Sequence, residues 1–347
     1  MRSQEATNSS NKVLPDKSKN VGDSSTKAKI KRVLICRPNH RLGNLLLITP
    51  LVQEIAETFP DCKIDLFVKG GLGPIVFKNY ENVDNIIQLP KRPLKQLSRY
   101  VKGWISIRKH KYDIVIDADK KSSSGRLSFL FANSKDKIPG NIIEDLNLKY
   151  NDYKHHAKFS VYNFRNYLKE IGYAQKDTPI PSVNLKLTKP EIGRAKELLV
   201  KLTNNTRQTI SIFTYATGNK CYSESWWENF YHRLQTEFPN LNIVEVLPVE
   251  NISKLSFKAP AFYSKDVREI ASFIANTLVF VGADSGIMHL ASSSQTPTVA
   301  LFSVTDQTLY EPYNDGSVAI NTNNINIDEC IQIIREIVER RLRHELA

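Results

Sequence analysis

The residues best suited to chemistry stand in one stretch, Asp284-Ser285-Gly286-Ile-Met-His289. His289 comes four residues after Ser285, so on a helix the two side chains share one face. The N–H groups and positive pole at a helix start bind phosphate and sugar oxygens. The stretch therefore predicts a ligand site. Because Asp and Ser are also preferred N-cap residues, a helix cap with an interior histidine is the structural alternative.

The flanking sequence predicts the elements that would position these residues. Residues 278–281 are apolar and predict a buried strand, residues 282–286 a tight turn, and residues 287–293 a helix. A second strand is predicted over residues 298–302, with Pro297 at its start. Such a β-α-β unit places ligands at the carboxyl ends of its parallel strands.

The longer string carries a family resemblance. Gly-x-Asp-Ser-Gly-x-x-His-Leu-Ala, then Thr-Pro-Thr-Val-Ala-Leu-Phe, then Thr305-Asp306 and Pro312-Tyr313 resembles the donor-binding signature of glycosyltransferase family 9, the ADP-heptose:lipopolysaccharide heptosyltransferases. The resemblance implies an α/β chain with the GT-B fold, in which two Rossmann-like domains face each other across a cleft. It also implies that the C-terminal domain binds a nucleotide sugar through residues that include Asp284, Ser285, Gly286 and His289, and that the N-terminal domain binds the acceptor.

Composition limits the class of protein. The chain has 347 residues, of which 41% are hydrophobic and 24% charged, as in an ordinary globular protein large enough for two domains. The sequence contains neither a long uncharged apolar run nor a signal peptide, so we expect a cytoplasmic location. The four cysteines are widely spaced and predict no metal site.

The formal net charge of +12 calls for an anionic partner, such as nucleic acid, anionic lipid or a phosphorylated sugar. The sequence has no zinc finger, aromatic RNA-binding motif or Lys-Arg block, so we expect no nucleic-acid partner. A basic surface would instead hold the protein at the inner face of the cytoplasmic membrane.

Hydrophobic periodicity and turn residues divide the chain into four parts. Residues 1–29 are polar and predict a disordered tail. Residues 30–172 predict the N-terminal, acceptor-binding domain and residues 173–190 a proline-containing linker, in which residues 182–187 could pair with a sheet edge. Residues 191–347 predict the nucleotide-sugar-binding domain, whose last helix is a candidate to pack back on the N-terminal domain.

The remaining elements follow from the same patterns. Further strands are predicted at residues 31–36, 63–68, 83–89, 112–118, 209–213, 241–247 and 259–263. Helices are predicted at residues 45–59, 94–109, 127–132, 156–171, 191–202, 266–276 and 327–342.

The residues from Gly43 to Pro50 resemble the N-terminal motif of the family, in which an aspartate after the glycine is taken as the general base. Here that position is Asn44, whose amide cannot accept a proton at neutral pH. Asn44 would then orient the acceptor. His40, in the same loop, is the nearest group of suitable pKa, with an exposed loop histidine as the alternative. Attack assisted by a weak base or by water is a third possibility.

Basic residues follow the strand predicted over residues 112–118. In the resemblance this edge faces the acceptor sugar, so Lys120, Lys121 and Arg126 are candidates to bind its carboxylates or phosphates. Arg126 is the first choice because a guanidinium binds such groups bidentately. Solvated surface charge is the structural alternative.

In the C-terminal domain, the loop after the strand over residues 209–213 matches the part of the family that contacts the donor diphosphate. The matching positions are Thr217, Gly218 and Lys220, and Lys220 would neutralise charge on the leaving diphosphate. Glu250 matches approximately the position that binds the ribose hydroxyls.

The resemblance thus implies an inverting, metal-independent glycosyltransferase that needs no cofactor beyond its nucleotide-sugar donor. It would move a sugar, heptose from ADP-heptose in the first instance, onto a lipopolysaccharide core or related lipid-linked glycan. The alternative is a nucleotide-sugar- or glycan-binding protein that has lost the base, as Asn44 permits. A nicotinamide dehydrogenase is disfavoured because no GxGxxG follows the first strand.

Overall fold

The computed structural model describes residues 29–119 and 122–346, with the side chains of residues 344–346 left out. The expected disordered tail thus lies almost wholly outside the described residues. The first part of the chain forms a five-stranded parallel sheet of order β3-β2-β1-β4-β5, here called the N-terminal half with its helices. Its strands are Arg32–Arg37 (β1), Lys63–Lys69 (β2), Val83–Leu89 (β3), Tyr112–Asp117 (β4) and Ser134–Ile138 (β5).

The second part, the C-terminal half, is a six-stranded parallel sheet of order β11-β10-β9-β6-β7-β8 with its helices. Its strands are Thr209–Phe213 (β6), Asn242–Val246 (β7), Ala261–Phe262 (β8), Val279–Ala283 (β9), Thr298–Phe302 (β10) and Val318–Asn321 (β11). The central strands β6, β9 and β10 are wholly buried, as their apolar runs predict.

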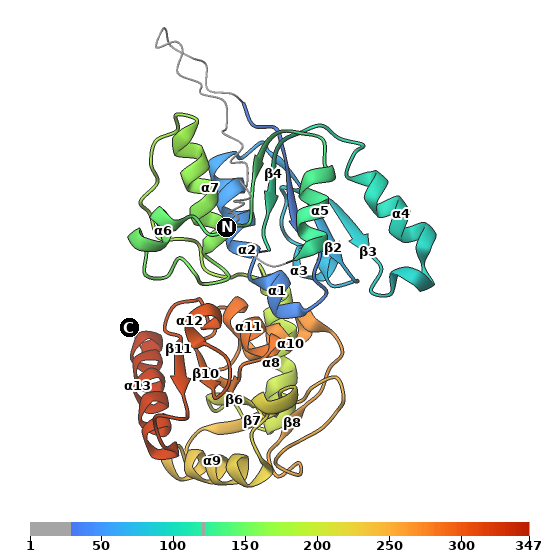
Figure 1. Ribbon diagram of the computed structural model, residues 1–347. Helices are drawn as coiled ribbons and strands as arrows, with labels where there is room; N and C mark the ends of the chain where they lie inside the picture. Colours follow the sequence, from blue (N-terminus) through green and yellow to red (C-terminus); the bar gives the residue numbers. More distant parts are fainter. Residues whose placement is uncertain (1–28, 120–121, 347) are drawn as a thin grey trace, which may run out of the picture.

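Helices cover the sheets and join the halves (Figure 1). They are Leu42–Leu46 (α1), Thr49–Thr58 (α2), Gly73–Val76 (α3), Leu97–Ser106 (α4), Ser123–Phe131 (α5), Glu144–Lys149 (α6), Phe159–Glu170 (α7), Lys189–Thr203 (α8), Glu224–Glu237 (α9), Val267–Ile274 (α10), Gly286–Ser293 (α11), Gln307–Tyr310 (α12) and Ile327–Leu346 (α13), with short 3₁₀ turns at Pro93–Lys95 (η1) and Gly218–Lys220 (η2). Among the helices of the described ranges, none has the length and apolarity needed to cross a bilayer.

Two predicted features differ in detail. The helix predicted over residues 45–59 is two helices, because Pro50 has no N–H to continue α1 and the Thr49 hydroxyl bonds back to the Leu46 carbonyl at 2.7 Å. The strands β5 and β11 were not predicted. Both are edge strands, and β5, Ser-Lys-Asp-Lys-Ile, lacks the apolar run that marks a central strand.

The segment over residues 182–187 does not pair with a sheet edge. It runs without regular secondary structure between the halves and forms hydrogen bonds with both. Gln53 of α2 donates to the Ser182 carbonyl at 2.9 Å, and Gln295 donates to the Val183 carbonyl at 2.6 Å. The buried guanidinium of Arg268 in α10 donates to the Leu185 carbonyl at 3.1 Å. We call this segment the strap.

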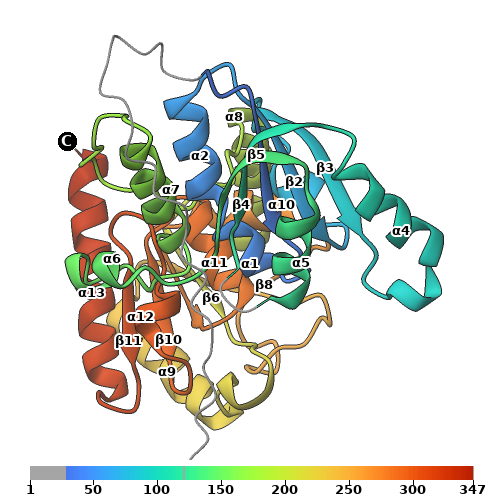
Figure 2. The same ribbon diagram turned by 45° about the horizontal axis from the view of Figure 1, so that its top comes forward.

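The halves meet through α1 and α11, which contact each other between the two sheets (Figure 2). One hydrophobic cluster continues across this junction, from Leu46 and Ile48 of the N-terminal half to Met288 and Ala291 of α11. The last helix, α13, packs against α9 and β9 in the C-terminal half.

Candidate active site

A cavity of about 590 Å³ lies where the halves meet. It is lined from the N-terminal half by the start of α1 and from the C-terminal half by the carboxyl ends of β6, β9 and β10. The lining residues are Arg41, Leu42, Gly43, Asn44, Thr217, Lys220, Asp284, Ser285, Gly286, His289, Thr305 and Tyr310. The sequence motifs from both ends of the chain thus share one cavity.

Two glycines allow α1 to approach α11 this closely. A Cβ added to Gly43 would lie 2.7 Å from Cδ2 of His289, which is closer than carbon atoms pack. One added to Gly286 would lie 3.5 Å from Cβ of Leu42. Gly43 therefore sets the distance between the motif of the N-terminal half and the imidazole of the C-terminal half.

Lys220 and Asp284 form an ion pair in the cavity wall. Lys220 Nζ lies 2.5 Å from Asp284 Oδ2, and the carboxylate is buried while the lysine is half-buried. The lysine comes from η2 after β6 and the aspartate from the turn after β9, and these strands are neighbours in the sheet. The pairing orients the ammonium group at the cavity surface, where it can bind an anion.

Ser285 is the N-cap of α11, as the structural alternative has it, because its hydroxyl accepts the Met288 N–H at 3.2 Å. The cap uses the N–H of the third residue of the helix and leaves those of Gly286 and Ile287 to other partners. The helix start at the cavity wall can thus still bind an anion.

His289 is almost wholly buried, and this burial lowers its pKa to about 4 although Asp284 opposes the shift. The imidazole is therefore neutral at pH 7. Its buried Nδ1 has no hydrogen-bond partner among the described residues. His289 is thus not a satisfied interior histidine, and its ring can supply a polar atom to a ligand.

Asn44 is held by an arginine that the sequence analysis did not select. Arg37, at the end of β1, is buried and donates from Nη2 to Asn44 Oδ1 at 3.1 Å and from Nη1 to the Ala118 carbonyl at 2.7 Å. Nη1 also lies 3.2 Å from Asp119 Oδ2. Since the amide oxygen of Asn44 is engaged, its NH₂ group is left as a hydrogen-bond donor for a ligand in the cavity.

His40 is not brought into the cavity. It is exposed, and its Cβ is the neighbour of Gly70 across the loop. Partial burial, with Lys91, Lys69 and Arg41 nearby, lowers its pKa. This placement agrees with the exposed-loop alternative.

The other predicted residues surround the site or fall outside the description. Gly218 stands between Thr217 and Lys220 with φ of 64°, which favours glycine. Glu250 is exposed beyond the end of β7 and Arg126 is exposed in the first turn of α5, and neither lines the cavity. Lys120 and Lys121 lie outside the described residues.

Tyr310 and Arg41 line the cavity without having been predicted. Tyr310, from α12, stacks on His156 with ring centroids 4.5 Å apart, and its ring is 6.4 Å from that of His289. The sequence could have indicated Tyr310 by its position between Asp306 and Pro312, inside the stretch that resembles the family signature.

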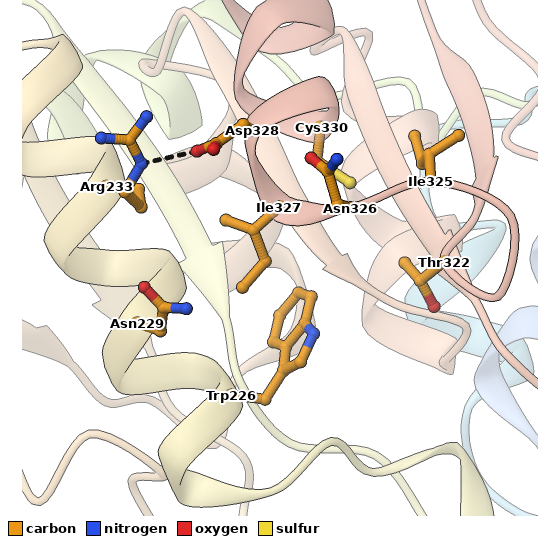
Figure 3. Close-up of a pocket in the computed structure, with 9 residues that line it drawn as sticks. All are labelled: Trp226, Asn229, Arg233, Thr322, Ile325, Asn326, Ile327, Asp328 and Cys330. Carbon is orange, nitrogen blue, oxygen red and sulfur yellow. Dashed lines mark hydrogen bonds and ion pairs between the residues drawn. The ribbon is translucent and has the colours of Figure 1, made fainter.

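A second cavity, of about 680 Å³, lies between α9 and the start of α13 (Figure 3). Trp226 forms one wall, and an ion pair of 2.7 Å joins Arg233 Nε to Asp328 at the opposite side. This second cavity is larger than the one at the junction of the halves, yet none of the predicted site residues line it. The volume of a cavity therefore does not identify the active site.

Comparisons with known proteins agree with this geometry. The model of glycosyltransferase family 9 (heptosyltransferase) matches residues 265–334, which contain the Asp284–His289 stretch. Lipopolysaccharide heptosyltransferase 1 of Campylobacter coli is 22% identical over 332 residues, covering 85% of this chain and 93% of that protein.

Solved structures share the fold. The glycosyltransferase family 9 protein of Veillonella parvula DSM 2008 has a TM-score of 0.71 at 15% identity, covering 91% of this chain and 99% of its own. The structure of E. coli heptosyltransferase WaaC with ADP has a TM-score of 0.65 at 18% identity, covering 88% of this chain and 99% of its own. The structure of E. coli ADP-heptose lps heptosyltransferase II has a TM-score of 0.63 at 14% identity, covering 90% of this chain and 99% of its own.

Two parallel-sheet halves that share a cavity, and the likeness to these solved structures, define the GT-B fold. The predicted fold class is therefore confirmed. The match of the family model and the likeness to the Campylobacter coli heptosyltransferase also confirm the resemblance to glycosyltransferase family 9 drawn from the sequence.

Proposed function

We propose that this protein is an inverting, metal-independent transferase that moves heptose from ADP-heptose onto a lipopolysaccharide core or related lipid-linked glycan. The observation that carries the proposal is the single cavity in which Lys220, Asp284 and His289 face Asn44 across the junction of the halves. The relatives named above as heptosyltransferases support the donor and the acceptor class.

The C-terminal half would bind the donor. Lys220, Thr217 and the start of α11 suit the diphosphate. Glu250, which lies outside the cavity lining, would bind the ribose only if the donor extends beyond the cavity. The acceptor oxygen attacks the anomeric carbon from the face opposite the diphosphate, so the configuration inverts. As the bond from that carbon to the diphosphate oxygen breaks, its electron pair leaves with the nucleoside diphosphate. The Lys220 ammonium stabilises that charge in the role that a metal ion has in other transferases.

The N-terminal half would bind the acceptor. The amide NH₂ of Asn44 orients the attacking hydroxyl, and Arg126, Lys120 and Lys121 pair with anionic groups of the glycan. Because such acceptors are lipid-linked, we place the enzyme in the cytoplasm at the inner face of the membrane. A nucleotide-sugar-binding protein without turnover is not favoured by the relatives, which are named as transferases.

The test is ADP release from ADP-heptose in the presence of lipopolysaccharide that lacks its heptoses. We expect turnover that Lys220→Ala and Asp284→Ala each reduce by at least a hundredfold. Lys201→Ala, on the exposed side of α8, is the matched control and should leave it unchanged. ADP binding without turnover in the wild type would instead identify a binding protein.

A further inference from the structure

The outer side of α4 is apolar where it faces solvent. Leu94 in η1 is 94% exposed, and Leu97 and Ile105 in α4 are 60% and 55% exposed. With Val101, these residues recur at intervals of three and four, so they lie along one side of the helix. Single exposed apolar residues are ordinary, but a continuous row of them marks an interaction surface.

Helix α5 extends this surface. Its side chains Leu127, Leu130 and Phe131 are exposed, and the ring of Phe131 packs on Trp104 of α4 with centroids 6.0 Å apart. We call these residues, with the exposed row on α4, the α4–α5 surface. In both views α4 lies at the outer edge of the N-terminal half, away from the C-terminal half (Figure 1, Figure 2).

The charge around the α4–α5 surface has one sign. Residues 91–111 contain eight Lys and Arg and no Asp or Glu. All eight are exposed, and they are Lys91, Arg92, Lys95, Arg99, Lys102, Arg108, Lys109 and Lys111. Arg108 also lies over the Phe131 ring, 5.0 Å from its centroid, so the cations border the apolar row directly.

We propose that the α4–α5 surface docks on an anionic phospholipid bilayer. A helix with an apolar side and basic flanks lies in the headgroup layer, its apolar side chains reaching the acyl chains and its cations the phosphates. A second copy of the chain fits less well, because it would bring two groups of eight positive charges together. Nucleic acid would use the cations but not Leu97, Val101 and Ile105.

This orientation also suits the reaction. α5 begins at the carboxyl end of β4, the edge where Arg126 stands, so the α4–α5 surface continues to the acceptor side of the N-terminal half. A lipid-linked acceptor would then reach the cavity from the same layer that the surface contacts. This last step rests on the proposed function, whereas docking itself does not.

The experiment is flotation of the full chain with vesicles of phosphatidylcholine alone or with one third phosphatidylglycerol, at low and at physiological salt. We expect binding to the anionic vesicles only. Leu97→Ser/Val101→Ser/Ile105→Ser should lower the bound fraction at least tenfold, and Lys95→Gln/Lys102→Gln should lower it by about fivefold for each charge. The matched controls are Leu148→Ser on α6 and Lys196→Gln/Lys201→Gln on α8, all of them exposed residues.

Three results would overturn the proposal. One is the absence of vesicle binding, and another is binding that the triple serine variant retains, which would be electrostatic adsorption alone. The third is a dimer, detected by light scattering, that the triple variant converts to monomer, which would identify a second copy as the occupant. Equal melting temperatures show that the variants fold, and ADP-heptose turnover with detergent-dispersed acceptor reports on the proposed function separately.

The contacts of Arg37 suggest which residue takes the place of the general base that Asn44 cannot provide. The guanidinium of Arg37 holds the Asn44 amide with one terminal nitrogen and the Asp119 carboxylate with the other. The resemblance to glycosyltransferase family 9 implies a carboxylate at the position where this chain has Asn44. Here a carboxylate stands on the other side of the same arginine, at the end of the neighbouring strand β4.

We infer that Asp119 is the general base for the acceptor hydroxyl, an inference that rests on the proposed function. As the acceptor oxygen bonds to the anomeric carbon, its proton passes to the Asp119 carboxylate, and the diphosphate leaves with the electron pair of the broken bond. Arg37 binds both Asp119 and Asn44, and the NH₂ group of Asn44 orients the same hydroxyl.

The test is an exchange of the two side chains. Asp119→Asn should lower kcat at least a hundredfold with ADP binding unchanged, and adding Asn44→Asp to that variant should restore at least tenfold. Asp61→Asn, exposed at the opposite end of the sheet, is the control. A fall of less than tenfold, or no recovery in the exchanged variant, overturns the inference. If the wild type shows no turnover with ADP-heptose, the proposed function has failed instead.

Discussion

The two sides of the cavity are built differently. On the C-terminal side, Lys220, Asp284 and His289 stand at the ends of buried neighbouring strands, and the carboxylate and imidazole are themselves buried. On the N-terminal side, the buried Arg37 was not predicted, and the predicted residues His40 and Arg126 are exposed. The C-terminal side is therefore fixed before a ligand arrives, which suits the leaving-group stabilisation proposed for it. The N-terminal side offers exposed side chains, which suit the large acceptor proposed to bind there.

Replacing Lys220 should have the largest effect. Without its ammonium group the diphosphate loses its cation, and Asp284 is left as a buried, unpaired carboxylate. We expect Lys220→Ala to lower kcat by about 10²- to 10³-fold, and Lys220→Arg to recover part of this because it keeps the charge. Steady-state kinetics with saturating acceptor would measure it. An effect on KM alone, with kcat unchanged, would contradict the proposed role of Lys220 in stabilising the leaving diphosphate.

The close approach of the sides can be tested at Gly43. In Gly43→Ala the new methyl meets the His289 ring, so either this buried imidazole or α1 must shift. We expect a loss of about 1–3 kcal/mol in the free energy of unfolding and at least a tenfold loss of turnover. The matched control is Gly193→Ala in α8, where a Cβ meets no atom within 4 Å. That change should raise stability by up to about 1 kcal/mol, as urea denaturation would show. Unchanged turnover in Gly43→Ala would refute the argument.

Two buried histidines near the junction should make stability depend on pH. Burial lowers the pKa of His155 to about 3, and the ring bonds to the Glu311 carbonyl of the C-terminal half at 2.9 Å. Since the unfolded chain takes up protons near pH 6.5, the stability that His155 and His289 contribute is present above pH 6.5. It is lost as the pH falls toward 4. Asp117 opposes this, because burial raises its pKa to about 6.

The contribution of His155 is therefore measured as the difference in the free energy of unfolding between the wild type and a variant without this histidine. We expect His155→Gln to lower the free energy of unfolding by about 1–3 kcal/mol at pH 7.5. The gap from the wild type should close as the pH falls to 4.5. Urea denaturation at several pH values checks this, and a gap that widens at low pH would contradict the burial of a neutral ring.

The smallest effect is expected at Arg126. Because it is exposed, Arg126→Ala should raise KM for the acceptor by about two- to tenfold and leave kcat nearly unchanged. Raising the salt concentration should have a similar effect on the wild type but little on the variant. A fall in kcat comparable with that of Lys220→Ala would contradict the proposed difference between a buried, fixed C-terminal side and an exposed N-terminal side.

Asp284, Ser285, Gly286 and His289 could be placed at one cavity from the sequence because they lie in one contiguous β-α-β unit, whose residues share a strand end by local geometry alone. Lys220 was chosen through the family pattern, and its pairing with Asp284 follows from β6 lying beside β9. The contact of Arg37 with Asp119 was not predicted, for the opposite reason. They meet only because β1 pairs with β4, and strand order is a property of the whole sheet that local pattern does not reveal.

Other predictions show the same limit. Thr217 and Lys220 follow a strand end closely and reach the cavity, whereas Glu250 lies farther along an exposed loop whose path the pattern did not specify. His40 was chosen for its pKa, but the direction of its loop takes it toward Gly70. Gly43 was recognised as part of a motif, and only the structure shows that its lack of a side chain lets α1 contact α11.

The strap has a consequence for how the two halves move. Its carbonyls accept hydrogen bonds from α2 on one side and from α10 and Gln295, after α11, on the other, so a hinge motion of one half against the other is restrained. Substrates would then meet a nearly preassembled crevice. The radius of gyration in small-angle scattering should hardly change when ADP is added.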